Sequence, residues 1–295
     1  MRKIISVSGG KDSTAVALLA MEQNKPEDVI FIFCDTGNEH YKTYEYLNYL
    51  DDYFQSKGFS KIVRLKLDTT ERLKRKAEKL KDYPEIAKHI RPTGSVFLDL
   101  CLINGRFPGF TSRFCTKELK IKPANDFINQ FLQNGESVEV WTGVRADESA
   151  KRAKYPEREL RTEDKKTGAQ AWDVRPILNW TVEDVFKKIK DSGIEANPLY
   201  AMGFSRVGCT PCIFANKKEL KLLSELSPIE FYKIEAWEKY LQNGSINGSS
   251  TYYYSENNEG VWAKVKWANT YIKRGRPKKV QVENKTVSDN LKGVK

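Results

Sequence analysis

The chain has 295 residues, with 40% hydrophobic side chains, 30% charged side chains and a formal net charge of +11. Its 6 Trp, 14 Tyr and 14 Phe residues exclude a collagenous or wholly disordered chain. No apolar run approaches the roughly 20 residues that span a bilayer, and the N-terminus turns polar at Ser8, so a membrane or secreted protein is excluded. We expect a cytoplasmic protein with no membrane partner.

Short apolar runs alternate with segments of helical spacing through the first two thirds of the chain. The expected strands are residues 4–7, 29–33, 61–67, 138–144 and 172–178. The expected helices are residues 14–23, 41–57, 71–79, 117–133 and 181–191. This alternation predicts an α/β fold with a doubly wound, mostly parallel sheet.

Other segments lack the strand–helix alternation. The charged segment 68–95 is expected to leave the sheet, while residues 96–115 and 151–170 are expected to be loops, the second mobile or partner-dependent. After about residue 213 the pattern is helical, at 216–226, 228–242 and 260–273. We therefore predict a nucleotide-binding domain over 1–215, a helical region over 216–272 and a basic tail over 273–295.

The segment between the first strand and the first helix reads Ser8-Gly9-Gly10-Lys11-Asp12-Ser13. Two glycines allow close approach of the backbone to an anion, and the following helix N-terminus directs N–H groups at it. The hydroxyls of Ser8 and Ser13 are donors, Lys11 supplies a positive charge, and Asp12 either holds Mg²⁺ or caps the helix. The spacing is neither that of a Walker loop nor that of the Gly-x-Gly-x-x-Gly fingerprint. This segment predicts a phosphate-binding site.

Polar side chains also follow the second and fourth expected strands. Because the carboxyl ends of parallel strands meet at one edge, we expect these side chains to face the same crevice as the phosphate loop. Asp35, beside Thr36, is expected to accept from a ribose hydroxyl or the adenine amine, or to form a turn, and Gly143 to permit close approach of a nucleotide. The remaining candidates are Arg145 and Arg152 for phosphate oxygens, Asp147 for Mg²⁺, and Glu148 or Ser149 for fixing the loop. Arg152 could equally be a solvated charge.

The five cysteines raise the question of metal binding or thiol chemistry. Cys209 and Cys212 have the Cys-x-x-Cys spacing of half a zinc or iron–sulfur site, and Cys101 and Cys115 are the natural second half. The alternative is four scattered structural cysteines. Cys34 is expected to be a buried, small apolar residue.

Residues 8–13 resemble the PP-loop of the adenine nucleotide α-hydrolase superfamily, whose members cleave ATP between the α and β phosphates and adenylate a substrate. Further motifs resemble the phosphoadenosine phosphosulfate (PAPS) reductase family over roughly residues 1–215. They are Phe33-Cys34-Asp35-Thr36-Gly37 with Thr43, Arg113-Phe114-Cys115-Thr116 with Lys120 and Pro123, Gly143 to Ser149 with Arg152, and Asn197-Pro198-Leu199-Tyr200 with Gly208 to Cys212. The resemblance implies ATP and Mg²⁺ as cofactors, with Lys11, Asp12, Ser13 and Arg145 as the catalytic residues.

The sequence departs from the reductases in its cysteines. Reductases of this family carry a nucleophilic cysteine near the C-terminus, whereas no cysteine follows Cys212 here. Cluster-bearing relatives have a Cys-Cys pair where Cys115-Thr116 stands, so Cys101 would supply the fourth ligand. On this resemblance we expect a four-iron cluster, with zinc as the alternative.

The chain also resembles the PP-loop ATP pyrophosphatase subunit of DNA phosphorothioation systems. That resemblance implies adenylation of a nucleic acid, DNA rather than RNA, for sulfur insertion from a cysteine desulfurase or another persulfide donor. The positive charge agrees with a polyanionic partner, although the basic tail could simply aid solubility. The alternatives are a PAPS or adenosine phosphosulfate reductase, a tRNA thiolation enzyme, and a non-enzymatic nucleic-acid-binding module.

Several segments are candidate contacts to a nucleic acid backbone. They are the basic helix at 71–81, the loop at 151–166 and residues 274–279, each of which could equally be a solvated face. The run Tyr252-Tyr253-Tyr254 is expected either to stack on bases or to pack in the protein.

Overall fold

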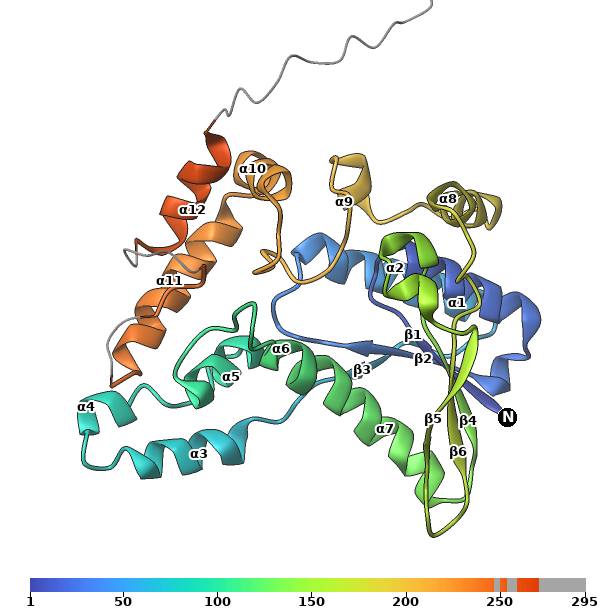
Figure 1. Ribbon diagram of the computed structural model, residues 1–295, viewed down its shortest axis with the longest axis horizontal. Helices are drawn as coiled ribbons and strands as arrows, with labels where there is room; N and C mark the ends of the chain where they lie inside the picture. The colour runs from blue at the N-terminus through green and yellow to red at the C-terminus, as the bar shows by residue number, and fades with distance from the viewer. Residues whose placement is uncertain (247–249, 254–258, 271–295) are drawn as a thin grey trace, which may run out of the picture.

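The computed structural model of the protein describes residues 1–246, 250–253 and 259–270 (Figure 1). Its centre is a six-stranded sheet with the order β3-β2-β1-β4-β6-β5. All neighbouring strands are parallel except β5 and β6, which are antiparallel. The strands are β1 (Arg2–Ser6), β2 (Val29–Cys34), β3 (Val63–Leu65), β4 (Val138–Trp141), β5 (Arg158–Glu163) and β6 (Gln170–Val174). The predicted doubly wound, mostly parallel α/β sheet is confirmed.

Helices cover both faces of this sheet. One apolar layer joins Ile5 and Phe31 to helices α1, α2 and α8, and the opposite layer joins Ile4 and Val140 to α7. The apolar strands are thus buried on both faces, as the runs of β-branched and aromatic residues indicate. The helices concerned are α1 (Lys11–Gln23), α2 (Tyr41–Ser56), α7 (Lys122–Gln133) and α8 (Val182–Asp191).

The remaining longer helices form a second lobe beside the sheet, at the left of Figure 1. Its core contains Leu73, Leu100, Phe231 and Ile234, from helices far apart in the sequence. The lobe's helices are α3 (Thr70–Lys79), α4 (Pro84–Ala87), α5 (Val96–Asn104), α10 (Lys217–Leu226), α11 (Ile229–Asn243) and α12 (Gly260–Asn269). The predicted excursion at 68–95 and the helical C-terminal region therefore share one core.

The chain also contains several short helical segments. They are the 3-10 turns η1 (Pro26–Asp28), η3 (Ala146–Glu148) and η4 (Arg152–Lys154), the helices α6 (Phe114–Thr116) and α9 (Pro198–Ala201), and the π-helical segment η2 (Lys117–Ile121). α6, η2 and α7 follow one another without a break, so the predicted helix at 117–133 is present with a π-helical first turn.

Two loop predictions are wrong. Residues Val96–Asn104 form α5, whose buried residues from Val96 to Leu102 give it no polar face that a helical period could reveal. Residues Arg158–Glu163 form β5, an edge strand with exposed charged side chains. Such side chains are typical of edge strands, where they discourage pairing with other chains.

None of the helices in the described part of the chain has the length and apolar composition that crossing a bilayer requires. The basic tail at 273–295, the candidate contact at 274–279, and Tyr254 lie outside the described residues.

Candidate functional site

The phosphate loop joins β1 to α1 in the middle of the sheet. Gly9 has φ of +73°, a left-handed conformation that favours glycine. A Cβ atom on Gly9 would also lie 2.9 Å from Cγ2 of Thr43, a residue of α2. Glycine at position 9 is therefore required both by backbone conformation and by the close packing of α2.

Ser13 holds the loop closed. Its Oγ accepts a hydrogen bond from the N–H of Ser8 (3.0 Å) and donates to the carbonyl of Gly10 (2.9 Å). The Oγ atoms of Ser8 and Ser13 lie 3.1 Å apart. The two serines that the sequence singles out thus meet at the mouth of the loop, with their hydroxyls side by side.

Asn197 and Tyr200, which are far from the phosphate loop in the sequence, form hydrogen bonds to it. Asn197 caps α9 through the N–H of Leu199 (3.0 Å), and its Nδ2 donates to the carbonyl of Gly9 (3.0 Å). The hydroxyl of Tyr200 accepts from the N–H of Lys11 (2.9 Å), at the start of α1. The site-residue prediction did not include Asn197 and Tyr200, although both belong to the Asn-Pro-Leu-Tyr motif.

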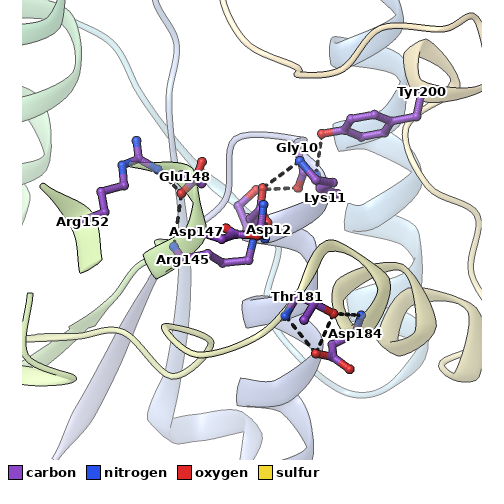
Figure 2. Close-up of polar contacts among 11 residues, drawn as sticks. Gly10, Lys11, Asp12, Arg145, Asp147, Glu148, Arg152, Thr181, Asp184 and Tyr200 are labelled. Atoms are coloured by element: carbon purple, nitrogen blue, oxygen red, sulfur yellow. Dashed lines mark hydrogen bonds and ion pairs between the residues drawn. The ribbon is translucent and has the colours of Figure 1, made fainter. Parts of the chain in front are cut away.

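Asp12 and Asp147 form ion pairs with the buried side chain of Arg145 (Figure 2). Nε of Arg145 lies 2.6 Å from Oδ1 of Asp12, and its Nη1 lies 2.5 Å from Oδ2 of Asp147. The Arg145 side chain is only 4% exposed, so burial opposes its charge; the two carboxylates nevertheless raise its pKa above the ordinary value. Arg145 thus holds Asp12 in place, while the other carboxylate oxygen of Asp12 lies 3.2 Å from Nζ of Lys11.

Glu148 links this group to Arg152. Its Oε2 accepts from the N–H of Arg145 (3.2 Å) and pairs with Nη1 of Arg152. Ser149 accepts from the N–H of Arg152 (3.3 Å), which agrees with the predicted role of fixing this loop. Figure 2 shows Glu148 and Arg152 on one side of the phosphate loop and Tyr200 on the other.

These residues surround a polar cavity of about 400 Å³. Ser8, Gly10, Lys11, Asp12 and Ser13 line it on one side. The rest of the lining includes Thr142, Gly143, Glu148, Arg152, Tyr200 and Arg206. Amides, hydroxyls and cations therefore converge on one space, which is the arrangement that binds phosphate groups. We call it the phosphate cavity.

A smaller cavity of about 190 Å³ adjoins the phosphate cavity and shares Ser6, Ser8 and Thr142 with it. Its other walls are mainly apolar, with Val7, Ile32, Phe33, Ile121, Ala124 and Val140. We call it the apolar cavity. Arg161 of β5 also lines it and is held by Asp173 (2.7 Å) and Asn125 (2.7 Å). No sequence pattern indicates this residue, because the pattern does not predict β5 itself.

A third cavity, of about 510 Å³, lies on the other side of Ser8. Cys115, Cys209 and Cys212 line it, together with Thr36 and Lys120. It shares Ser8, Arg152, Arg206 and Val207 with the phosphate cavity. We call it the thiol cavity.

Cys209 lies in a polar corner of the thiol cavity. Its Sγ is 3.5 Å from Oγ1 of Thr36 and 3.8 Å from Oε1 of Glu39. Burial raises the pKa of the Cys209 thiol to about 11, although Lys120 opposes this shift. The negative charge of a Cys209 thiolate in turn raises the pKa of Lys120. The sequence-based site prediction did not include Glu39 or Lys120, although Lys120 belongs to a motif of the family resemblance and Glu39 stands two residues after Gly37.

The predicted four-cysteine metal site is not assembled here. In residues 1–246, 250–253 and 259–270, no three His, Cys, Asp or Glu side chains are grouped so as to hold a metal ion. Burial raises the pKa values of Cys101 and Cys115 above their usual range, so both thiols are protonated near neutral pH. A metal ion would itself displace these protons, so protonation does not exclude a cluster. The grouping of the side chains, in which Cys209 is directed at Thr36 and Glu39, does not fit a preformed one.

Asp35 and Cys34 form hydrogen bonds at the end of β2. Oδ1 of Asp35 accepts from the N–H of Gly37 (2.9 Å) and from the hydroxyl of Tyr44 (2.7 Å), so this residue forms the turn. Cys34 is half-buried, and its Sγ donates to the carbonyl of Lys120 (3.3 Å). Of the residues predicted at this strand end, Thr36 lines the thiol cavity.

The sequence of residues 2–215 matches the phosphoadenosine phosphosulfate reductase domain family. The chain is 41% identical over 276 residues to an uncharacterized 37.8 kDa protein in the gpa 5′ region of Escherichia phage 186, covering 85% of this chain and 79% of that protein. It is 33% identical over 99 residues to an adenosine 5′-phosphosulfate reductase of Streptomyces coelicolor, covering 33% of this chain and 37% of that enzyme.

Among solved structures, the PAPS reductase of Candida auris has a TM-score of 0.43 and 18% identity, over 71% of this chain and 81% of that one. The match over residues 2–215 spans the phosphate loop, the strand-end residues and the Cys-x-x-Cys segment. The chain therefore belongs to the phosphoadenosine phosphosulfate reductase domain family.

Proposed function

We propose that the protein is an ATP pyrophosphatase that adenylates a nucleic acid, most simply a DNA backbone phosphate, for sulfur insertion. The observation that carries the proposal is the meeting of three cavities at Ser8, which lines all of them. The phosphate cavity suits a triphosphate, the apolar cavity suits a base, and the thiol cavity leaves room for an acceptor. An ordinary nucleotide-binding protein would not need the third space.

The residues of the phosphate cavity have separate roles in this proposal. The loop amides, Ser8, Ser13 and Lys11 bind the β and γ phosphates, which leave together as pyrophosphate. Asp12 and Glu148 supply the carboxylate oxygens that Mg²⁺ prefers, and the ion would neutralise charge on the phosphates. Arg145 positions Asp12, and Arg152 lies where the phosphate and thiol cavities meet.

The proposed reaction has two steps. An oxygen of the acceptor attacks the α phosphorus of ATP, and pyrophosphate leaves. A persulfide sulfur, supplied by a cysteine desulfurase or a similar donor, then displaces AMP, and an external thiol cleaves the remaining S–S bond. Neither step uses a metal cluster, so the four-iron cluster, or zinc in its place, stays a hypothesis that rests on the resemblance.

The first prediction tests the proposal by pyrophosphate release from Mg-ATP, with anaerobically purified full chain, alone and with added DNA or RNA. We expect release that DNA stimulates. Ser13→Ala removes the hydroxyl that closes the loop and should lower the rate about 100-fold or more. Ser56→Ala, an exposed serine on α2, is the matched control and should keep the wild-type rate.

Release of ADP and inorganic phosphate would contradict cleavage between the α and β phosphates. A Ser13→Ala variant as fast as the wild type would contradict the placement of the active site. Stimulation by tRNA and not by DNA would keep the adenylation chemistry and change the acceptor.

A second candidate function is reduction of a sulfonucleotide, favoured by the three cysteines that line the cavity next to the phosphate cavity. In that case PAPS or adenosine phosphosulfate would yield sulfite in the presence of a thiol reductant, without ATP. Sulfite formation without pyrophosphate release would replace the proposed function by this one.

A further inference from the structure

The thiol cavity is strongly cationic. Arg113, Lys120, Arg152 and Arg206 line it, and none of the described residues in its walls is acidic. Arg152 pairs with Glu148. By contrast, the salt bridges among the described residues include none to Arg113 or Arg206. Two cations at the mouth of the cavity are thus available to an anion.

An aromatic side chain stands beside these cations. Phe110 lies in the loop between α5 and α6 and is 67% exposed, the largest exposed fraction among the large hydrophobic residues. Its ring packs edge-on against Phe214, with centroids 4.9 Å apart. The guanidinium of Arg113 lies 4.2 Å from the centroid of the same Phe214 ring. Phe214 thus supports both side chains, and the outer face of Phe110 remains open.

The aromatic side chain lines a hollow that adjoins the cationic thiol cavity. A cavity of about 430 Å³ lined by Arg106 and Phe110 shares Pro108, Ile213 and Tyr252 with the thiol cavity. A strand lying on Phe110 would therefore continue past Arg113 to the junction at Ser8 and Arg152, where the phosphate cavity begins. Cationic grooves with exposed aromatic faces bind single strands, because the bases of a duplex are stacked on one another and cannot offer their faces.

We propose that Phe110, Arg113 and Arg206 form a platform for a single-stranded or locally unpaired DNA segment, with a base stacked on Phe110 and the backbone between the two arginines. This assignment rests on the proposed function, since it specifies the acceptor of that same site. It differs from the backbone contacts predicted from sequence. On α3, for example, Lys74 pairs with Glu71 and Arg72 pairs with Glu118.

The second prediction concerns the binding of fluorescently labelled oligodeoxythymidine to the full chain. Binding is measured by fluorescence anisotropy with Mg²⁺ and ATP present. Phe110→Ala should weaken binding at least about fivefold, the effect of losing about 1 kcal/mol of stacking. Phe110→Trp keeps an aromatic face and should bind the oligonucleotide with wild-type affinity. Arg113→Ala and Arg206→Ala should each reduce the slope of log K against log salt by about 0.7, the share of one phosphate contact on a single strand.

Matched controls lie in the segment between α3 and α5. Tyr83→Ala removes an exposed aromatic residue and Arg91→Ala an exposed cation, and both should bind like the wild type. Melting temperatures of all variants show whether each one folds. Because Phe110 is mostly exposed, its truncation leaves no buried void.

The outcomes separate this inference from the proposed function. Wild-type binding and salt slope in all three variants, with DNA-stimulated pyrophosphate release intact in the wild type, would overturn the platform and leave the function standing. Equal affinity for a blunt duplex would also overturn it. Absence of both oligonucleotide binding and pyrophosphate release in the wild type would overturn the two together. Weaker binding of PAPS in the variants, with no DNA binding in the wild type, would assign the cavity to a small sulfonucleotide instead.

Discussion

Gly143 has a packing role that the sequence does not indicate. The sequence predicts that its missing side chain permits close approach of a nucleotide, and Gly143 does line the phosphate cavity. In the structure, a Cβ on Gly143 would also lie 2.7 Å from the carbonyl carbon of Asp12 and 2.8 Å from the backbone nitrogen of Ser13. The glycine therefore allows the first turn of α1 to pack against the end of β4.

The third prediction is that Gly143→Ala moves this turn. Overpacking against backbone atoms costs about 1–3 kcal/mol, and the displaced loop should weaken Mg-ATP binding. Gly109→Ala is the control for stability, because nothing lies within 4 Å of its added Cβ atom. Urea unfolding and calorimetric titration with Mg-ATP measure the two effects. A Gly143→Ala protein with wild-type stability and affinity would show that β4 and α1 need not touch.

At the scale of elements, hydrophobic patterns in the sequence predict the buried strands. They do not predict β5, whose pairing depends on charged side chains. β5 has no apolar alternation; it is fixed to β6 by Arg161 with Asp173 (2.7 Å) and by Arg175 with Glu159. Such cross-strand pairs depend on the register of two strands and leave no period in one. α5 was missed for the opposite reason, because it is apolar on every side. The phosphate loop was predicted because all its chemistry lies within six consecutive residues.

The fourth prediction concerns His40, the N-cap of α2. Its Nδ1 accepts from the N–H of Lys42 (3.1 Å), and its Nε2 lies 3.0 Å from Oγ of Ser227. Burial, together with Lys233 and Lys42, lowers the pKa of His40 to about 4. The unfolded chain, with a His pKa of about 6.5, therefore takes up the proton first. The free energy of unfolding therefore keeps its full value above pH 6.5 and falls by roughly 3 kcal/mol towards pH 4.

Urea unfolding across this pH range tests the cap. His40→Asn can still cap the helix but does not titrate, so its stability should depend less on pH than that of the wild type. His89→Asn, at the only other histidine of the chain, should keep the wild-type dependence. If the free energies of unfolding of His40→Asn and the wild type changed equally with pH, His40 would not be the group whose titration destabilises the protein.

At the scale of the whole molecule, Tyr252 joins segments that the sequence could not place together. Its hydroxyl donates to the carbonyl of Pro211 (2.6 Å) and accepts from Nδ2 of Asn38 (3.2 Å), while its ring lies in the core of the second lobe. One side chain thus connects the end of β2, the Cys-x-x-Cys segment and the C-terminal helices. Of the two expected roles for Tyr252 and Tyr253, the structure supports packing, since both are buried.

The fifth prediction is that Tyr252→Phe destabilises the protein by about 1–2 kcal/mol, because the buried carbonyl of Pro211 loses its shorter hydrogen bond and keeps only the one from Nδ2 of Asn38 (3.3 Å). Tyr253→Phe removes one longer bond, to the carbonyl of Cys212 (3.3 Å), and should cost less. Chemical denaturation compares the two variants. Equal losses would mean that the junction at Tyr252 contributes no more than an ordinary tyrosine contact.

The chain from Asn197 to Cys212 has two attachments. At one end Asn197 and Tyr200 bind the phosphate loop, and at the other Cys209 forms a β-bridge with Glu39 while the N–H of Thr210 bonds to the carbonyl of Asn38 (2.6 Å). A displacement of one end of this segment would act on the hydrogen bonds at its other end. Under the proposed function, the nucleotide and the acceptor would each lie beside one end, so binding of either would favour or oppose binding of the other by the same free energy.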